Sequence, residues 1–108
     1  MNKKTKNLFD ARAKIIKALA HPTRLFIVDT LSKSELCVQD LTKLVGADIS
    51  TVSKHLSILK ESGIIEDEKR GLQVWYSLRT PCVMNFFGCI ESVIESNALQ
   101  QINLVSRK

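Results

Sequence analysis

A chain of 108 residues, 44% of them hydrophobic and 25% charged, has the size and composition of a single soluble globular domain. Its apolar runs never exceed a handful of residues, whereas a membrane-spanning helix needs about 20, so we expect a cytoplasmic protein with no membrane contact. Sixteen lysines and arginines against eleven acidic residues give a net charge of +5, which suits a polyanionic partner such as nucleic acid but equally an ordinary solvated surface.

The first three predicted elements are helices. Apolar side chains at three- and four-residue spacing predict a helix over residues 8–20, which His21-Pro22 ends because the residue before a proline leaves helical geometry. A second short helix is predicted from Thr23 to Leu31. A third is predicted to begin at Ser34-Glu35, and its apolar side chains are Leu36, Leu41, Leu44 and Val45.

A tight break at Gly46-Ala47-Asp48 precedes a fourth helix, predicted from about Ile49 to Ser62. Asp48 is suited to cap this helix, because its carboxylate accepts a hydrogen bond from an early backbone N–H and faces the positive end of the helix. Gly63 stands at the usual glycine position after a helix. The side chains predicted to enter the core are Ile49, Val52, Leu56 and Leu59. The outward side chains are small and polar or basic: Ser50, Thr51, Ser53, Lys54 and Ser57.

The hydrophobic period changes after Gly63. Residues 72–78 alternate apolar and polar side chains, which predicts a half-buried strand, and residues 65–69 are its predicted partner across a basic turn. Thr80-Pro81 is interpreted as the cap and first position of a last helix. That helix carries a wide apolar stripe: Val83, Phe86, Phe87, Ile90, Val93 and Ile94. Residues 101–108 show no pattern, and we expect them and residues 1–6 to be flexible ends of one domain, residues 1–108.

The predicted fold is mainly α with a small β-hairpin, in the order ααααββα. Two helices joined by a tight turn and followed by a hairpin with a basic tip describe a winged helix-turn-helix. A helix fits the major groove of DNA, where hydroxyls and lysines reach phosphates and base edges, and the wing tip reaches an adjacent minor groove. The alternative, a merely solvated helix face, leaves this order of elements unexplained. The predicted DNA-binding residues are Ser50, Thr51, Ser53, Lys54, Ser57, Lys69 and Arg70.

Five segments follow in order: LAHPTRL (19–25), ELCVQDL (35–41), STVSKHL (50–56), LKESGII (59–65) and GLQVWYSL (71–78). Together they resemble the ArsR/SmtB family of metal- and thiol-responsive repressors, over roughly residues 11–95. The resemblance implies a homodimer paired through its first and last helices, which binds palindromic operators in double-stranded DNA and releases them when a ligand docks. A dimer is also favoured by the apolar last helix, which exposes too large a surface for a small monomer.

Cys37, Cys82 and Cys89 form neither an even disulfide framework nor a C-x-x-C pair, so we expect free thiols. Arsenic-sensing members of the resembled family carry Cys-Val-Cys-Asp-Leu-Cys in the third helix, of which only Cys37 remains here. The site is not expected in that form. The family's zinc site on the last helix is not expected either, because the matching positions are Thr80, Cys82, Val93 and Ser96.

Cys82 and Cys89 remain as a candidate inducer site, because some arsenic-responsive relatives use cysteines seven apart on this helix. Cys82 lies at the predicted second helical residue, where the positive end of the helix favours the thiolate. Seven residues correspond to about 10.5 Å of helix rise, too long for two sulfurs to share one ion with bonds of about 2.3 Å. A shared ion therefore requires an unwound first turn, or two last helices paired antiparallel in the dimer. We predict that Cys82 and Cys89 bind trivalent arsenic, antimony or another soft metal as inducer, with no cofactor required, and that a third sulfur comes either from Cys37 or from an external thiol.

Three alternatives stay open. The cysteines are inert packing residues, or they sense oxidants or persulfides by forming a disulfide, or the winged helix docks proteins without binding DNA. His21 is interpreted as structural, His55 as a packing or phosphate-contacting residue and Trp75 as a packing residue of the wing, none of them as a ligand-binding residue. The sequence has no Ser/His/acid set, paired carboxylates or nucleotide-binding glycine loop, so we do not expect an enzyme.

Overall fold

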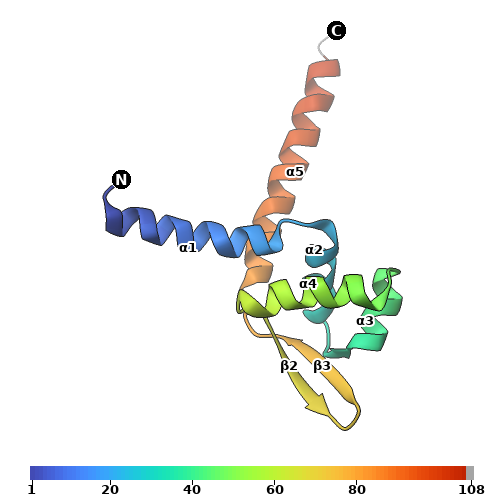
Figure 1. Ribbon diagram of the computed structural model, residues 1–108. Helices are drawn as coiled ribbons and strands as arrows, with labels where there is room; N and C mark the ends of the chain where they lie inside the picture. Colours follow the sequence, from blue (N-terminus) through green and yellow to red (C-terminus); the bar gives the residue numbers. More distant parts are fainter. Residues whose placement is uncertain (107–108) are drawn as a thin grey trace.

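The computed structural model describes residues 1–106. Within these residues, five helices and a three-stranded sheet make up the fold, which confirms the prediction of a mainly α winged helix-turn-helix (Figure 1). The elements are α1 Lys3–Leu19, α2 Pro22–Leu31, β1 Leu36–Cys37, α3 Val38–Val45, α4 Ile49–Glu61, β2 Ile65–Arg70, β3 Gln73–Leu78 and α5 Val83–Ser106.

The helices α2, α3 and α4 form a compact body, from which the hairpin β2–β3 extends at one end while α1 and α5 project away (Figure 1). Ile49, predicted to enter the core, is instead 52% exposed, because as the first residue of α4 it lies at the edge of this body. The core consists of Ala18, Leu19, Ile27, Val28, Leu31, Leu41, Val52, Leu56, Leu59, Ile64 and Ile65.

Both ends of the described chain are helical. The first helix begins at Lys3, five residues before the predicted start, because the Asn2 side chain caps it by accepting a hydrogen bond of 2.8 Å from a backbone N–H of the first turn. The last helix continues to Ser106, so residues 101–106 are helical although they show no sequence pattern. The flexibility expected of the two ends stays a prediction. Two of the residues to which it applies, 107–108, lie outside the described residues.

The prediction that the third helix begins at Ser34-Glu35 is wrong. Residues 36–37 form the strand β1, and α3 begins only at Val38. The strand pairs antiparallel with β3, through Leu36 with Tyr76 and Cys37 with Trp75. Without β1, the backbone N–H and C=O groups along this edge of β3 would have no partners in the sheet. Pairing with β3 therefore overrides the helical pattern of the local sequence. The sheet therefore has the order β1-β3-β2 instead of the two strands predicted.

The hairpin agrees with the predicted one. Its strands pair antiparallel from Ile65 with Leu78 to Arg70 with Gln73, which leaves a two-residue turn that opens with Gly71. Gly71 has a positive φ of 64°, as the first position of a type II′ turn requires.

The last helix begins at Val83, two residues beyond the predicted start at Pro81. The intervening residues form a turn, in which the Val83 N–H donates to the Thr80 carbonyl at 3.1 Å. Although α5 is 24 residues long, neither it nor another helix of residues 1–106 combines the length and apolar character needed to cross a membrane.

Candidate nucleic-acid interface

The turn between α3 and α4 sets the position of the exposed helix. Gly46 ends α3 in the left-handed conformation, with φ of 76°. Asp48 then caps α4, because its carboxylate accepts hydrogen bonds from the Thr51 backbone N–H at 2.8 Å and from the Ser50 hydroxyl at 3.3 Å. Hydrogen bonding from Thr51, followed by that from Ser50 and the charge of Lys54, lowers the pKa of Asp48. The cap therefore stays ionised and holds the start of α4 in place.

One face of α4 is buried and the opposite face is open to solvent. Val52, Leu56 and Leu59 are at most 1% exposed and anchor the helix in the core. The five α4 side chains predicted to contact DNA are all exposed: Ser50, Thr51, Ser53, Lys54 and Ser57. Lys54 forms no ion pair with any of residues 1–106, so its charge is available to a phosphate.

His55 points away from this open face, toward the junction of α1 and α2. Its Nδ1 lies 3.1 Å from Arg24 Nη1, and its ring centroid lies 4.5 Å from that of His21. Arg24 Nε donates to the Ala18 carbonyl at 2.7 Å, and His21 caps α2 through Nδ1, which accepts from the Thr23 N–H at 3.1 Å. These contacts support the structural interpretation of His21 and a packing role for His55, and they tie α4 to the two helices before it.

The C-terminal part of α4 is joined to the wing by an ion pair. Lys60 Nζ lies 2.9 Å from Asp67 Oδ2 on β2. The hydrogen bond and the charge of Asp67 raise the pKa of Lys60. The pair links the exposed helix to the wing.

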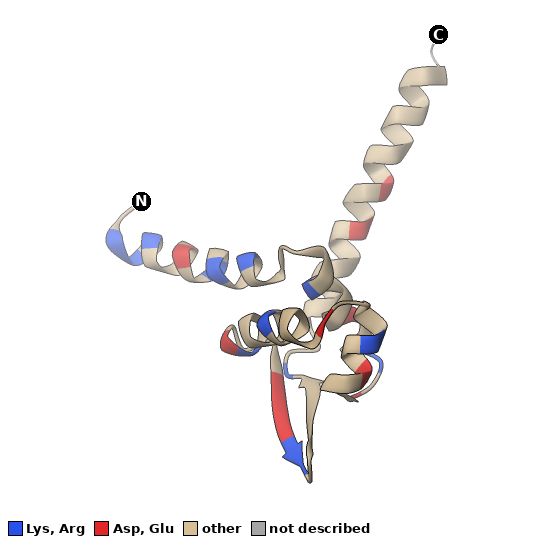
Figure 2. Ribbon diagram, turned by 45° about the vertical axis from the view of Figure 1, so that its right-hand side comes forward, with Lys and Arg blue, Asp and Glu red and all other residues tan. Residues whose placement is uncertain are grey.

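The wing has an acidic stem and a basic tip (Figure 2). Lys69 is exposed and forms no ion pair within the described part of the chain. Arg70, the other predicted DNA-binding residue at the tip, pairs with Glu35 at 2.9 Å and with Glu68 at 3.1 Å. Its guanidinium carbon also lies 5.4 Å from the centroid of the Trp75 ring, so Trp75 packs within the wing. The two carboxylates, that of Glu35 first, raise the pKa of Arg70.

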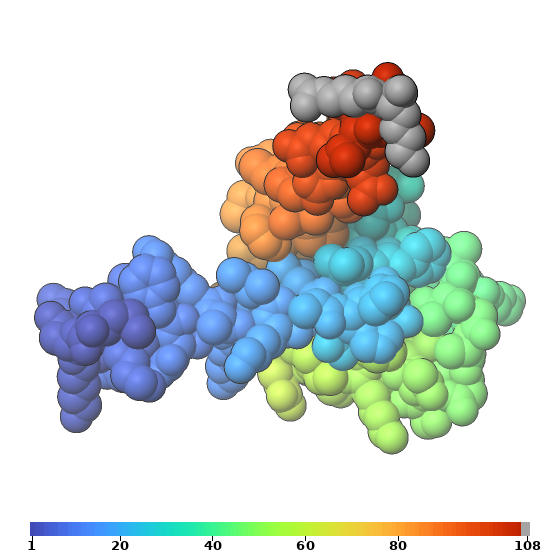
Figure 3. All heavy atoms as spheres, turned by 90° about the horizontal axis from the view of Figure 1, so that it is seen from above, coloured from blue at the N-terminus to red at the C-terminus, as the bar shows by residue number. Residues whose placement is uncertain are grey.

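The two end helices leave apolar side chains open to solvent, and Figure 3 shows how far α1 stands out from the body. No residue of α5, from Val83 to Ser106, is buried. The radius of gyration is 17.5 Å, whereas a compact domain of this length has about 13 Å. A groove of about 460 Å³ between α1, α2 and α5 is lined chiefly by apolar side chains: Ile16, Leu19, Ala20, Leu25, Phe26, Phe86, Phe87, Ile90 and Ile94, with Asp29 and Glu91.

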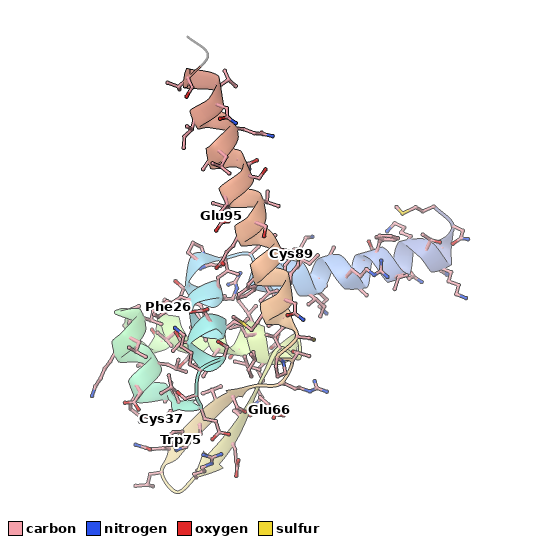
Figure 4. All side chains as sticks on the ribbon, turned by 180° about the vertical axis from the view of Figure 1, so that it is seen from behind. Phe26, Cys37, Glu66, Trp75, Cys89 and Glu95 are labelled. Carbon is pink, nitrogen blue, oxygen red and sulfur yellow. The ribbon has the colours of Figure 1, made fainter. Side chains whose placement is uncertain are left out.

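The cysteines lie in two parts of the molecule. Cys37 is buried in β1, where it is 4% exposed, whereas Cys82 and Cys89 are exposed. Cys82 lies one residue before α5 and not at its predicted second position. Figure 4 places Cys37 beside the wing and Cys89 on α5, well separated. Residues 1–106 of one chain contain no group of three His, Cys, Asp or Glu side chains that could hold a metal ion.

Sequence reasoning missed three residues that position the interface. They are Arg24 beside His55, Glu35 beside Arg70 and Asp67 beside Lys60. Each acts through a partner on another element of the fold, so no local pattern reveals the contact.

Comparison with known proteins agrees with this geometry. The family described as "Bacterial regulatory protein, arsR family" matches residues 21–67. A cadmium resistance transcriptional regulatory protein CadC homolog of Staphylococcus aureus is 43% identical over 67 residues, which are 61% of this chain and 55% of the relative. The transcriptional repressor BigR from Xylella fastidiosa has a similar crystal structure, with a TM-score of 0.68 and 30% identity over 88% of this chain and 97% of that chain.

A solution NMR structure of the homodimeric winged helix-turn-helix DNA-binding domain of Mb0332 from Mycobacterium bovis is also similar, with a TM-score of 0.77 and 28% identity over 91% of each chain. The family and these proteins are regulators and not enzymes, which confirms the prediction that the chain is not an enzyme. The chain spans little more than half of several curated relatives, 54–58% of their length.

Proposed function

This chain belongs to the arsR family of bacterial regulatory proteins, and from that premise we propose that it is a transcriptional repressor that binds double-stranded DNA as a homodimer. The observation that carries the proposal is the open face of α4, whose hydroxyls and Lys54 stand on a helix fixed by its Asp48 cap and its buried opposite face. A helix of this kind fits the major groove, where such side chains reach phosphates and base edges. The wing tip with Lys69 and Arg70 would follow the backbone into the adjacent minor groove.

Pairing through α1 and α5 is the proposed basis of the dimer. Both helices project from the body and expose apolar side chains, among them Leu8 and Ile15 of α1 and Ile90 and Ile94 of α5. A second copy would cover these side chains and would place two α4 helices in a two-fold arrangement. That arrangement matches a palindromic operator with half-sites one helical turn apart.

We further propose that a thiol-seeking inducer releases the operator by binding at Cys82 and Cys89. Both thiols are exposed near the start of α5, the helix that is proposed to pair the subunits. Trivalent arsenic or antimony is the first candidate, because soft metalloids prefer thiolate sulfur. A third sulfur would come from an external thiol, since Cys37 is buried beside the wing and one chain holds no three-ligand group within residues 1–106.

A second candidate signal is an oxidant or a persulfide. Two exposed thiols are enough for this chemistry, whereas trivalent arsenic prefers three, and this difference favours the alternative. Oxidation would join two thiols in a disulfide, with the two electrons and two protons passing to the oxidant.

Operator binding with and without the inducer tests the proposal. The purified protein is titrated into a duplex taken from upstream of its own gene and into a random duplex of the same length, under reducing conditions. We expect tighter binding to the first duplex, and release when arsenite is added. Equal affinity for both duplexes, or no binding to either, would overturn the repressor proposal and favour a winged helix that docks proteins. Binding that resists arsenite but is lost with peroxide or persulfide would favour the second signal.

A further inference from the structure

Arg70 differs from the other cation of the wing tip. It contacts three groups at once: the Glu35 carboxylate at 2.9 Å, the Glu68 carboxylate at 3.1 Å and the Trp75 ring, whose centroid is 5.4 Å from its guanidinium carbon. Lys69, the preceding residue, has no ion pair in residues 1–106. Only one of the two cations is therefore free to meet a phosphate without first losing a partner.

The fold brings one of these carboxylates from outside the hairpin. Glu68 lies two residues before Arg70 on β2, so the two side chains share a face of the strand. Glu35 instead ends the connection from α2 and directly precedes β1, whose residue Cys37 pairs with Trp75. The short strand β1 thus holds the Glu35 carboxylate against the wing, where it meets the guanidinium of Arg70.

A carboxylate pair on a guanidinium occupies the donors that a DNA phosphate would use, because both anions accept the same parallel N–H bonds. The side chains of Arg70 and Glu35 remain 42% and 49% exposed, so water and a phosphate can reach them. An exposed ion pair of this kind is weak enough to exchange partners.

We propose that Glu35 is a positioning residue that sets the affinity for DNA, because its carboxylate binds the Arg70 guanidinium where a DNA phosphate would otherwise bind. This role rests on the DNA binding proposed above. The arginine then reaches the DNA backbone only by exchanging a carboxylate for a phosphate. Glu35 therefore lowers affinity for DNA of any sequence, because a phosphate contact carries no sequence information.

Glu35→Gln is the principal test, measured by the affinity for an operator duplex and for a random duplex over a series of salt concentrations. We expect tighter binding to both, by about twofold to fivefold for each wing at low salt, which is the range of one exposed ion pair. The slope of log affinity against log salt concentration should steepen by about 0.9 for each additional phosphate that the variant neutralises.

Glu66→Gln is the matched control, because it removes the same charge from the exposed stem of β2 but Glu66 has no ion pair with Arg70.

A double-mutant cycle separates the release of Arg70 from the mere loss of an acid. Arg70→Gln alone should weaken binding to both duplexes, because it removes a cation that is proposed to reach the phosphate backbone, and the increase in affinity caused by Glu35→Gln should vanish when Arg70→Gln is added. The only tryptophan of the chain, Trp75, reports on the same exchange. Its fluorescence should change when DNA binds, because the Arg70 guanidinium leaves the ring, and the change should be lost in Arg70→Gln, which has no guanidinium.

The outcomes distinguish this inference from the proposed function. If the unmodified protein binds no duplex even at low salt, the proposed function fails and the role of Glu35 fails with it. If the protein binds DNA but Glu35→Gln raises the affinity no more than Glu66→Gln does, or still raises it without Arg70, the inference alone is wrong. Equal melting temperatures of the variants would exclude misfolding as the source of a difference.

Discussion

The imidazole rings of His21 and His55 lie 4.5 Å apart, and Arg24 Nη1 is 3.1 Å from Nδ1 of His55. The cluster joins His21, which caps α2, to the inner side of α4, the helix that presents the proposed DNA-binding face. A proton added to His55 would place a positive charge beside the guanidinium and a second imidazole. The packing of α4 against the body is therefore sensitive to protonation at this point.

We predict that the protein loses stability as the pH falls through the titration range of histidine. Partial burial first, and then the charges of His21 and Arg24, lower the pKa of His55 below its usual 6.5. The unfolded chain therefore takes up this proton at a higher pH than the folded chain does. Well above pH 6.5, protonation of His55 does not affect the free energy of unfolding. As the pH falls below that value, proton uptake by the unfolded chain lowers the free energy of unfolding progressively.

Melting temperatures over the range from about pH 8 to about pH 5 would measure this loss. His55→Gln keeps a polar side chain that does not titrate, so its melting temperature should fall less over the same range. Parallel profiles for the two proteins would show that other groups cause the acid sensitivity.

Leu56→Ala should strongly destabilise the fold. Leu56 is 1% exposed and lies on the buried side of α4, and removing a buried leucine side chain costs about 2–5 kcal/mol. Ile49→Ala on the same helix should cost much less, because the Ile49 side chain is 52% exposed. Denaturant unfolding of both variants gives the two free energies. Similar losses would mean that Ile49 packs more tightly, for instance against a partner subunit.

The elements that follow from local chemistry were predictable, whereas those that depend on distant partners were not. The Asp48 cap and the glycine that ends α3 act within a few residues, and the structure has both where the sequence places them. The strand β1 depends on pairing with Tyr76 and Trp75, far along the chain. The local sequence does not show these partners, and the apolar spacing around β1 by itself predicts a helix. The contact of Glu35 with Arg70 is hidden for the same reason, since it exists only once β1 has paired.

Lys54→Ala and Ser53→Ala should impair DNA binding in different ways. Loss of Lys54 leaves one phosphate without its cation, so affinity should fall for all sequences and the salt dependence should flatten by about 0.9 per phosphate. Loss of Ser53 should relax the preference at one base pair, by about 1–3 kcal/mol. Lys33→Ala is the matched control, because this exposed lysine pairs with Asp29 away from α4. Equal loss on operator and random DNA for Ser53→Ala would assign its hydroxyl to a phosphate.

Ile90→Asp should separate the subunits and weaken operator binding. Ile90 is 44% exposed and lines the apolar groove between α1, α2 and α5, where a second copy is proposed to pack. The introduced carboxylate would lose its water in the dimer interface without gaining an ion-pair partner, which costs free energy and opposes association. Ser92→Asp adds the same charge to α5 about 200° around the helix and should have a smaller effect. Sedimentation equilibrium gives the oligomeric state, and a dimer that survives Ile90→Asp would move the interface elsewhere.

Cys82→Ser and Cys89→Ser should each abolish release of the operator by arsenite while leaving DNA binding intact. Both thiols are exposed, Cys82 just before α5 and Cys89 within it, so a metalloid bound across the dimer would shift the spacing of the two α4 helices. For release to occur, the inducer must bind the DNA-free dimer more tightly than the DNA-bound dimer. Typical coupling of about 1–3 kcal/mol corresponds to about 5- to 150-fold in operator affinity.

Cys37→Ser should have a smaller effect on release, because Cys37 is buried in β1. Release that persists in both the Cys82 and the Cys89 variants would place the sensing site elsewhere and leave the two cysteines as packing residues. Release that instead follows peroxide treatment, with a disulfide seen on non-reducing gels, would assign the same thiols to oxidant sensing.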